Sequence, residues 1–170
     1  MVDHPTMLHG CAAASTSREA SFRIQKPVDT HRAARVIALD EAAARVTSEL
    51  ARHPWQGARF LTCHDATQTS GNGRRPDPVL LAVDGTPVRL SETLVDADVV
   101  VMIATGDDGA ALAAVIGETC DERRIMTAAL VIDSERRSRA AAAALRPYAQ
   151  VLLVSDDASD VVDLLSALRV

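Results

Sequence analysis

The turn Thr105-Gly106-Asp107-Asp108-Gly109 is the stretch of this sequence best placed to hold a ligand. It lies between an apolar run, Val99 to Ala104, and a helical pattern, Ala110 to Glu122, and a second apolar run follows from Thr127 to Ile132. This is the pattern of a βαβ crossover with buried parallel strands. Parallel α/β sheets bind ligands at the carboxyl ends of their strands, and a helix N-terminus there attracts anions. The turn is therefore the predicted position of a site.

Two pairs of carboxylates argue against a phosphate at this edge of the sheet. Asp40 and Glu41 follow the first predicted strand, and Asp107 and Asp108 lie in the turn itself. Like charges repel by about 1 kcal/mol per pair in water, and the acids of the turn can occupy the favourable field at the helix N-terminus themselves. Hard cations take carboxylate oxygens, so a divalent-cation site is one interpretation. We favour the simpler one, in which each pair caps a helix and faces water.

The other reactive side chains each have a simpler structural interpretation. Cys63 and His64 at the end of a strand could give an activated thiolate, but adjacent strand residues point to opposite faces. We therefore expect Cys63 to be buried and His64 exposed. Cys120 falls on the apolar face of its predicted helix and is expected in the core. Arg123-Arg124 and Arg136 to Arg139 could form a basic patch for an acidic partner, although solvated arginines at helix ends are the default.

Composition excludes several classes of function. The chain has 170 residues, of which 48% are hydrophobic and 2% aromatic, and a net charge of −5. It offers neither an aromatic platform nor a positive field for nucleic acid. Its three cysteines lack CxxC spacing, which argues against a disulfide framework or a structural zinc site and favours a reducing compartment. No apolar run approaches the length of a membrane span, so we expect a cytoplasmic protein without a membrane partner.

The order of elements predicts one α/β domain. Residues 1–33 lack apolar periodicity and are expected to form a disordered or loosely packed tail, in which His4, His9 and Cys11 could bind a metal only adventitiously. Residues 34–170 are expected to fold as a three-layer αβα sandwich with a mostly parallel, doubly wound sheet. The predicted strands are Arg35–Leu39, Arg59–Cys63, Val79–Val83, Val99–Ala104, Thr127–Ile132 and Val151–Val154. The predicted helices are Asp40–His53, Ser91–Val95, Ala110–Glu122, Ser134–Leu145 and one that begins at Asp156 or Asp157.

Several stretches between residues 35 and 157 carry a family likeness in apolar spacing and in a few residues. They are Val36-Ile37 with the helix after it, Trp55 to Leu61, Ala97 to Val101, Val115-Ile116 through Thr127 to Val131, and Arg139-Ala140 through Leu145 to the run Val151–Val154. Together they resemble the amino-terminal GTPase domain of the FtsZ/tubulin family. The resemblance implies a Rossmann-like sheet with strand order 3-2-1-4-5-6. It also implies that glycine-rich loops after the first and fourth strands face a guanine nucleotide.

The loops depart from this family pattern. Leu39 to Ala44 reads Leu-Asp-Glu-Ala-Ala-Ala where the family has a glycine-rich loop, and the turn at 105–109 is shorter than the family's GGGTGTG signature. The segment that holds ribose-contacting residues in the family is shortened here to Asp133–Arg137, and Asp157 stands where the family has an Asn near the base. We also expect the family's long central helix and second domain, which supply the residues activating the hydrolytic water, to be missing.

These departures predict a non-catalytic FtsZ/tubulin-like domain that acts as a structural or regulatory interaction subunit. Its nucleotide site is predicted to be lost, leaving at most a residual GTPase, and its partner is a protein or another copy of itself. The alternative is a Rossmann-like domain that binds GTP, GDP or another small phosphorylated ligand at the 105–109 loop. In either case the residues placed at the ligand site are Thr105, Gly106, Asp107, Asp108, Gly109, Asp40 and Glu41, and no catalytic residue or metal ligand is assigned.

Overall fold

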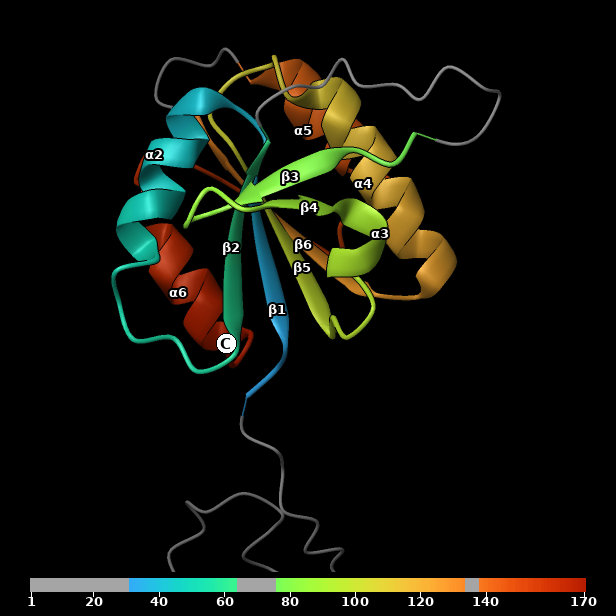
Figure 1. Ribbon diagram of the computed structural model, residues 1–170. Helices are drawn as coiled ribbons and strands as arrows, with labels where there is room; N and C mark the ends of the chain where they lie inside the picture. The colour runs from blue at the N-terminus through green and yellow to red at the C-terminus, as the bar shows by residue number, and fades with distance from the viewer. Residues whose placement is uncertain (1–30, 64–75, 134–137) are drawn as a thin grey trace, which may run out of the picture.

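The computed structural model describes residues 31–63, 76–133 and 138–170 (Figure 1). The predicted N-terminal tail therefore lies outside the described residues, except for residues 31–33. Those few residues are tied to the folded unit by the backbone. Arg32 N donates to the carbonyl oxygen of Arg169 at 2.9 Å, and Ala33 N donates to the carboxylate of Asp98 at 2.9 Å.

A seven-stranded sheet with the order β4-β3-β2-β1-β5-β6-β7 forms the centre of the domain. β2, β1, β5, β6 and β7 run parallel to one another. At one edge, β3 pairs antiparallel with β2, and β4 pairs antiparallel with β3. The six predicted strands lie in the expected order 3-2-1-4-5-6, which confirms a mostly parallel, doubly wound sheet. The strands are β1 (Ala34–Ala38), β2 (Ala58–Cys63), β3 (Val79–Ala82), β4 (Pro87–Arg89), β5 (Val99–Ala104), β6 (Met126–Ile132) and β7 (Val151–Ser155).

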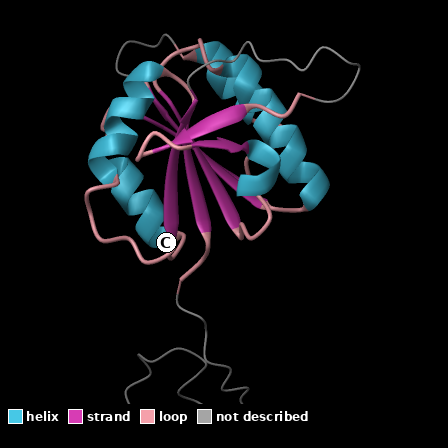
Figure 2. Cartoon of the chain, in the orientation of Figure 1, coloured by secondary structure: helices cyan, strands magenta, loops and turns pink. Residues whose placement is uncertain are grey.

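Helices cover both faces of the sheet, as Figures 1 and 2 show. α2 (Glu41–Leu50) and α6 (Asp160–Ala167) pack on one face, and α3 (Leu90–Thr93), α4 (Ala110–Arg123) and α5 (Arg139–Leu145) pack on the other. All six residues of β5 are buried because alternate side chains enter two separate cores. Val99, Val101 and Ile103 contact the α2 and α6 side, and the intervening residues contact the α4 and α5 side. The continuous apolar run in the sequence is thus the signature of a strand covered on both faces.

The strand β4 was not predicted. It is three residues long and begins with Pro87, so its pattern is too short to read as a strand. A signal was nevertheless present in Asp84-Gly85, because an Asp-Gly pair between two extended runs is typical of a hairpin. Gly85 has a φ of +82°, and the Asp84 carboxylate accepts a hydrogen bond from Thr86 N at 2.9 Å. This pair closes the hairpin between β3 and β4.

Several predicted helix boundaries are wrong. α2 ends at Leu50 instead of His53, and α6 begins at Asp160 instead of Asp156 or Asp157. The last helix starts late because the Asp157 carboxylate accepts a hydrogen bond from Ser159 N at 2.8 Å, which forms a turn before it. Ser134, the predicted cap of α5, lies outside the described residues.

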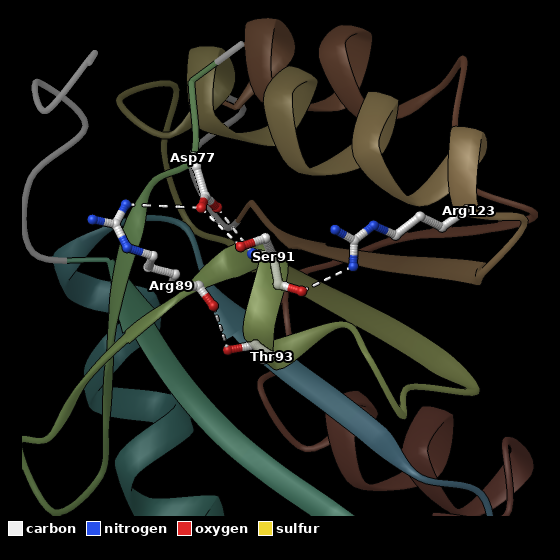
Figure 3. A network of polar contacts seen from close by, with 5 residues as sticks. All are labelled: Asp77, Arg89, Ser91, Thr93 and Arg123. Atoms are coloured by element: carbon white, nitrogen blue, oxygen red, sulfur yellow. Dashed lines mark hydrogen bonds and ion pairs between the residues drawn. The ribbon is translucent and has the colours of Figure 1, made fainter. Parts of the chain in front are cut away.

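Ser91 is also not the cap of the short helix α3. It lies inside that helix, and both its backbone N and its Oγ donate to the carboxylate of Asp77, at 2.9 and 2.8 Å (Figure 3). Asp77 therefore caps α3 from a distant part of the chain, and it also pairs with Arg89 at 3.8 Å. Arg123 at the end of α4 donates to the carbonyl oxygen of Ser91 at 2.9 Å, so one network joins α3 to α4.

We predict that Asp77→Ala lowers the free energy of unfolding by about 1–2 kcal/mol, because α3 loses its cap. Asp77→Asn keeps an oxygen acceptor and is the matched control, with a loss of less than about 1 kcal/mol. Urea denaturation followed by circular dichroism measures both values. Equal stability of Asp77→Ala and the wild-type protein would contradict this role for the network.

Candidate functional site

Asp40 stands at the carboxyl end of β1, where it begins helix α2. Its backbone is extended, with φ −141° and ψ 171°, and its Oδ1 accepts a hydrogen bond from Ala43 N at 2.8 Å. This geometry is that of an N-cap, in which a side-chain oxygen satisfies a backbone N–H that the helix leaves unpaired. The predicted capping role of Asp40 is confirmed.

The same carboxylate crosses to the loop after β5. Thr105 N donates to Oδ2 of Asp40 at 2.6 Å, Gly106 N donates to Oδ2 at 3.2 Å, and the Thr105 hydroxyl donates to Oδ1 at 2.5 Å. The contact is possible because β1 and β5 are neighbouring parallel strands, with Ala38 in register with Ile103, so their carboxyl ends meet. One carboxylate thus accepts four hydrogen bonds, one from the first turn of α2 and three from the loop after β5.

Two of these four donors are the backbone amides that a phosphate would need. Successive N–H groups at a loop before a helix form the usual cradle for an anion. In this chain the amides of Thr105 and Gly106 point to the carboxylate of Asp40. The sequence predicted that Asp107 and Asp108 supply an anion to this loop, but these two amides donate to Asp40, which lies outside the loop.

Asp107 makes a different contact from the one predicted. Its Oδ1 accepts a hydrogen bond from Ala141 N at 2.9 Å, in the first turn of α5, whereas α4 has Gly109 at its N-cap and no side-chain cap. Asp107 therefore joins the β5 loop to α5 instead of capping the helix that follows it. Asp108 is exposed, in agreement with the expectation that it faces water.

Six of the seven predicted site residues line one open hollow of ≈ 510 Å³ at this edge of the sheet. Its lining residues are Asp40, Glu41, Ala42, Arg45, Thr105, Gly106, Asp107 and Asp108. The lining therefore carries four carboxylates and one guanidinium. Glu41 forms an exposed ion pair with Arg45 at 3.3 Å, one helical turn away, and such a pair adds little stability. The net charge of the hollow is unfavourable for an anionic ligand.

Gly109, the seventh residue, serves the packing of the fold. A Cβ at this position would lie 2.6 Å from both the Cβ and the carbonyl oxygen of Leu39, so α4 can approach the end of β1 only through a glycine. Gly106 differs, because a Cβ there would meet no heavy atom within 4 Å. Close contact with Leu39 therefore requires a glycine at position 109, whereas the space around position 106 would accept a side chain.

The cation interpretation gains no support from the described ranges. Within residues 31–63, 76–133 and 138–170, no group of three or more His, Cys, Asp or Glu side chains comes together as a metal site would require. Asp40 directs its oxygens to backbone N–H groups, and Asp107 directs one oxygen to Ala141 N. His4, His9 and Cys11 lie outside the described residues.

Neither of the two described cysteines, Cys63 and Cys120, lines this hollow. Cys120 is fully buried on α4, as predicted, and burial raises the pKa of its thiol to about 11. It is therefore a protonated core residue at neutral pH. Cys63 is half-buried at the end of β2, less enclosed than expected, and His64 lies outside the described residues.

The predicted basic patch is only partly described. Arg123 donates to the Ser91 carbonyl and so has a structural contact, and Arg124 ends α4 with a left-handed backbone (φ 57°). Arg136 and Arg137 lie outside the described residues.

Within the ranges that the structure describes, none of the helices combines the length and the apolar character needed to cross a membrane.

No protein-family model matches this chain, and no curated protein matches it in sequence. Inference about function therefore depends on the residues themselves and on their arrangement at the edge of the sheet.

Exchange of each turn glycine for alanine tests whether packing requires a glycine at that position. We predict that Gly109→Ala lowers the free energy of unfolding by about 1–3 kcal/mol, because the new methyl group overlaps Leu39. Gly106→Ala should leave stability unchanged or raise it by up to about 1 kcal/mol, through the reduced entropy of the unfolded chain. Urea denaturation of the two variants checks this. A Gly109→Ala protein as stable as the Gly106→Ala protein would refute the packing argument.

Removal of the shared carboxylate should weaken the whole edge. Asp40→Ala removes the acceptor of four hydrogen bonds, so we predict a loss of about 2–4 kcal/mol in the free energy of unfolding. Glu41→Ala, next in the chain and exposed, is the control and should change stability by less than about 0.5 kcal/mol. Thermal and urea unfolding of both variants measure the difference. Similar losses for the two would argue against a special role of Asp40.

Proposed function

We propose that this chain is a non-catalytic domain of the FtsZ/tubulin type that acts as a structural or regulatory interaction subunit. The observation that carries the proposal is the bond from the amides of Thr105 and Gly106 to the carboxylate of Asp40. In a nucleotide-binding relative these amides would face a phosphate. Here a side chain of the protein takes the place of that anion.

A phosphate would have to displace Asp40 before it could bind. Displacement breaks the bonds from Thr105 and Gly106 and leaves the Asp40 charge in the same hollow as Glu41, Asp107 and Asp108. Each further negative charge about 4 Å from a carboxylate costs about 1 kcal/mol in water and about 4 kcal/mol at the lower effective dielectric of a protein surface. Arg45 alone does not compensate four carboxylates.

The composition of the hollow also supports the absence of catalysis. Its titratable side chains are carboxylates and one arginine, and the thiol of Cys120 is buried elsewhere. A hydrolase needs a nucleophile or a positioned water with a base, and groups that stabilise developing negative charge. The carboxylates around this hollow stabilise positive charge and destabilise the negative charge that develops during hydrolysis.

The alternative is a Rossmann-like domain that binds a nucleotide or another small phosphorylated ligand at the 105–109 loop. The hollow of ≈ 510 Å³ at the carboxyl ends of β1 and β5 favours it, because ligands of doubly wound sheets bind there. For this function Asp40 must rotate away from the amides of Thr105 and Gly106. A binding experiment distinguishes the two functions.

We predict that the wild-type protein gives no saturable heat with GTP or GDP and Mg²⁺ in isothermal titration up to millimolar ligand. Asp40→Asn removes the negative charge and puts an NH2 group, which cannot accept, in place of the Oδ2 that holds the amides of Thr105 and Gly106, so it should bring measurable binding of GDP. Asp108→Asn removes one charge from the same hollow without touching the amides, and it should have no such effect.

Micromolar binding of GTP or GDP by the wild-type protein would overturn the proposal in favour of the phosphorylated-ligand function. Equal gains for Asp40→Asn and Asp108→Asn would show that general charge, and not occupation of the amides by Asp40, excludes the nucleotide.

A further inference from the structure

The strand β7 forms an open edge of the sheet. All five of its residues are in register with β6 on one side, from Val151 opposite Ala128 to Ser155 opposite Ile132. No strand of the described ranges pairs with its other side. Alternate residues of such an edge direct their backbone N–H and C=O groups outward, where another strand can pair with them.

Three of the five side chains of β7 are both apolar and exposed, namely those of Val151, Leu153 and Val154. Its sequence Val-Leu-Leu-Val-Ser contains no charged residue and no proline. Val151 and Leu153 are each 38% exposed, and Val154 is 55% exposed. Proteins usually protect an edge with a lysine, a proline, a bulge or a very short strand. The regular register and composition of β7 include none of these devices.

The opposite edge of the same sheet is protected. β4 has only three residues, Pro87-Val88-Arg89, of which the proline and the arginine are exposed. Proline removes a backbone donor, and a charged side chain opposes the approach of a second strand. Among the residues that the structure describes, one edge of the sheet is therefore blocked and the other is open, which favours a partner strand on β7.

We propose that the partner is a second copy of this chain, paired antiparallel through β7 about a two-fold axis at Leu153, so that two sheets become one. The proposal rests on the proposed function as an interaction subunit, and it names the surface and the partner.

The sequence of β7 suits pairing with itself in this register. Leu153 lies opposite Leu153 of the second copy, Leu152 opposite Val154, and Val151 opposite Ser155. Apolar side chains thus meet apolar side chains at the centre, and no like charges face each other within the strand. A two-fold contact of this kind is also self-limiting, because each copy uses its β7 edge in the same contact.

Charges at the two ends of β7 favour the antiparallel direction. Asp156 and Asp157 directly follow the strand in the sequence. Gln150 directly precedes it and lines a hollow with Arg124 and Asp121. Parallel pairing would place the two acidic ends side by side. Antiparallel pairing separates these ends and brings Asp156 of each copy to the end where the other copy carries one base and one acid, Arg124 and Asp121. Electrostatics and strand register therefore select the same arrangement.

Sedimentation velocity of the 170-residue chain over a range of concentrations tests the dimer. The wild-type protein should show a monomer–dimer equilibrium. Leu153→Lys and Leu153→Glu each place like charges opposite each other on the axis, and each should weaken the dimer by at least about tenfold. An equimolar mixture of the two variants should recover dimers, because a lysine then faces a glutamate. Val95→Lys, at a valine that is 71% exposed outside β7, is the matched control and should dimerise like the wild-type protein.

Cross-linking provides a second readout. Antiparallel pairs at the axis have Cα atoms about 4.5–5.5 Å apart, so Leu153→Cys should form a disulfide-linked dimer on mild oxidation, in excess of the wild-type background. Val95→Cys should not. Circular dichroism of each variant confirms that it is folded before its assembly is judged.

A wild-type chain that stays monomeric at every concentration overturns the proposal, as does a dimer that Leu153→Lys leaves intact. In the latter case the interaction function stands and another surface carries it. Nucleotide binding by the wild-type protein would instead overturn the proposed function without any change in the β7 dimer, so the two failures are distinguishable.

Discussion

The carboxylate of Asp40 is the point on which the candidate site depends. It caps α2 through Ala43 N and holds the loop after β5 through Thr105 and Gly106. A doubly wound sheet leaves unpaired N–H groups where loops meet helices at the carboxyl ends of its strands, and these groups need an acceptor. In most such proteins a ligand can be that acceptor. Here the carboxylate of Asp40 accepts from two of these groups, the amides of Thr105 and Gly106.

The periodicity of the sequence was sufficient for the main architecture. Continuous apolar runs such as Val99–Ala104 predict strands buried on both faces, and the alternation of strands with helices predicts parallel order. Short elements were harder, because their local pattern does not distinguish them. β4 has three residues and α3 has four, and α3 is stabilised by Asp77, which lies thirteen residues before its first residue, Leu90, across a turn of the chain.

The candidate site was predictable in place but not in detail. Strand order brings the loops at residues 40 and 105 together, and six of the predicted residues line the same hollow. It did not show which acid would reach which amide. Asp107 turns toward Ala141 of α5, a contact that depends on the packing of α5 beside the β5 loop, whereas Asp40 is directed to the loop by the register of β1 with β5. Such choices depend on side-chain geometry, which apolar spacing does not encode.

Nuclear magnetic resonance of the amides of Thr105 and Gly106 tests the central claim most directly. Both N–H groups should keep their chemical shifts when GDP and Mg²⁺ are added to the wild-type protein, because Asp40 already accepts their hydrogen bonds. Saturable shifts of both signals on addition of GDP would contradict the account, since they would show that a phosphate takes the position of the carboxylate.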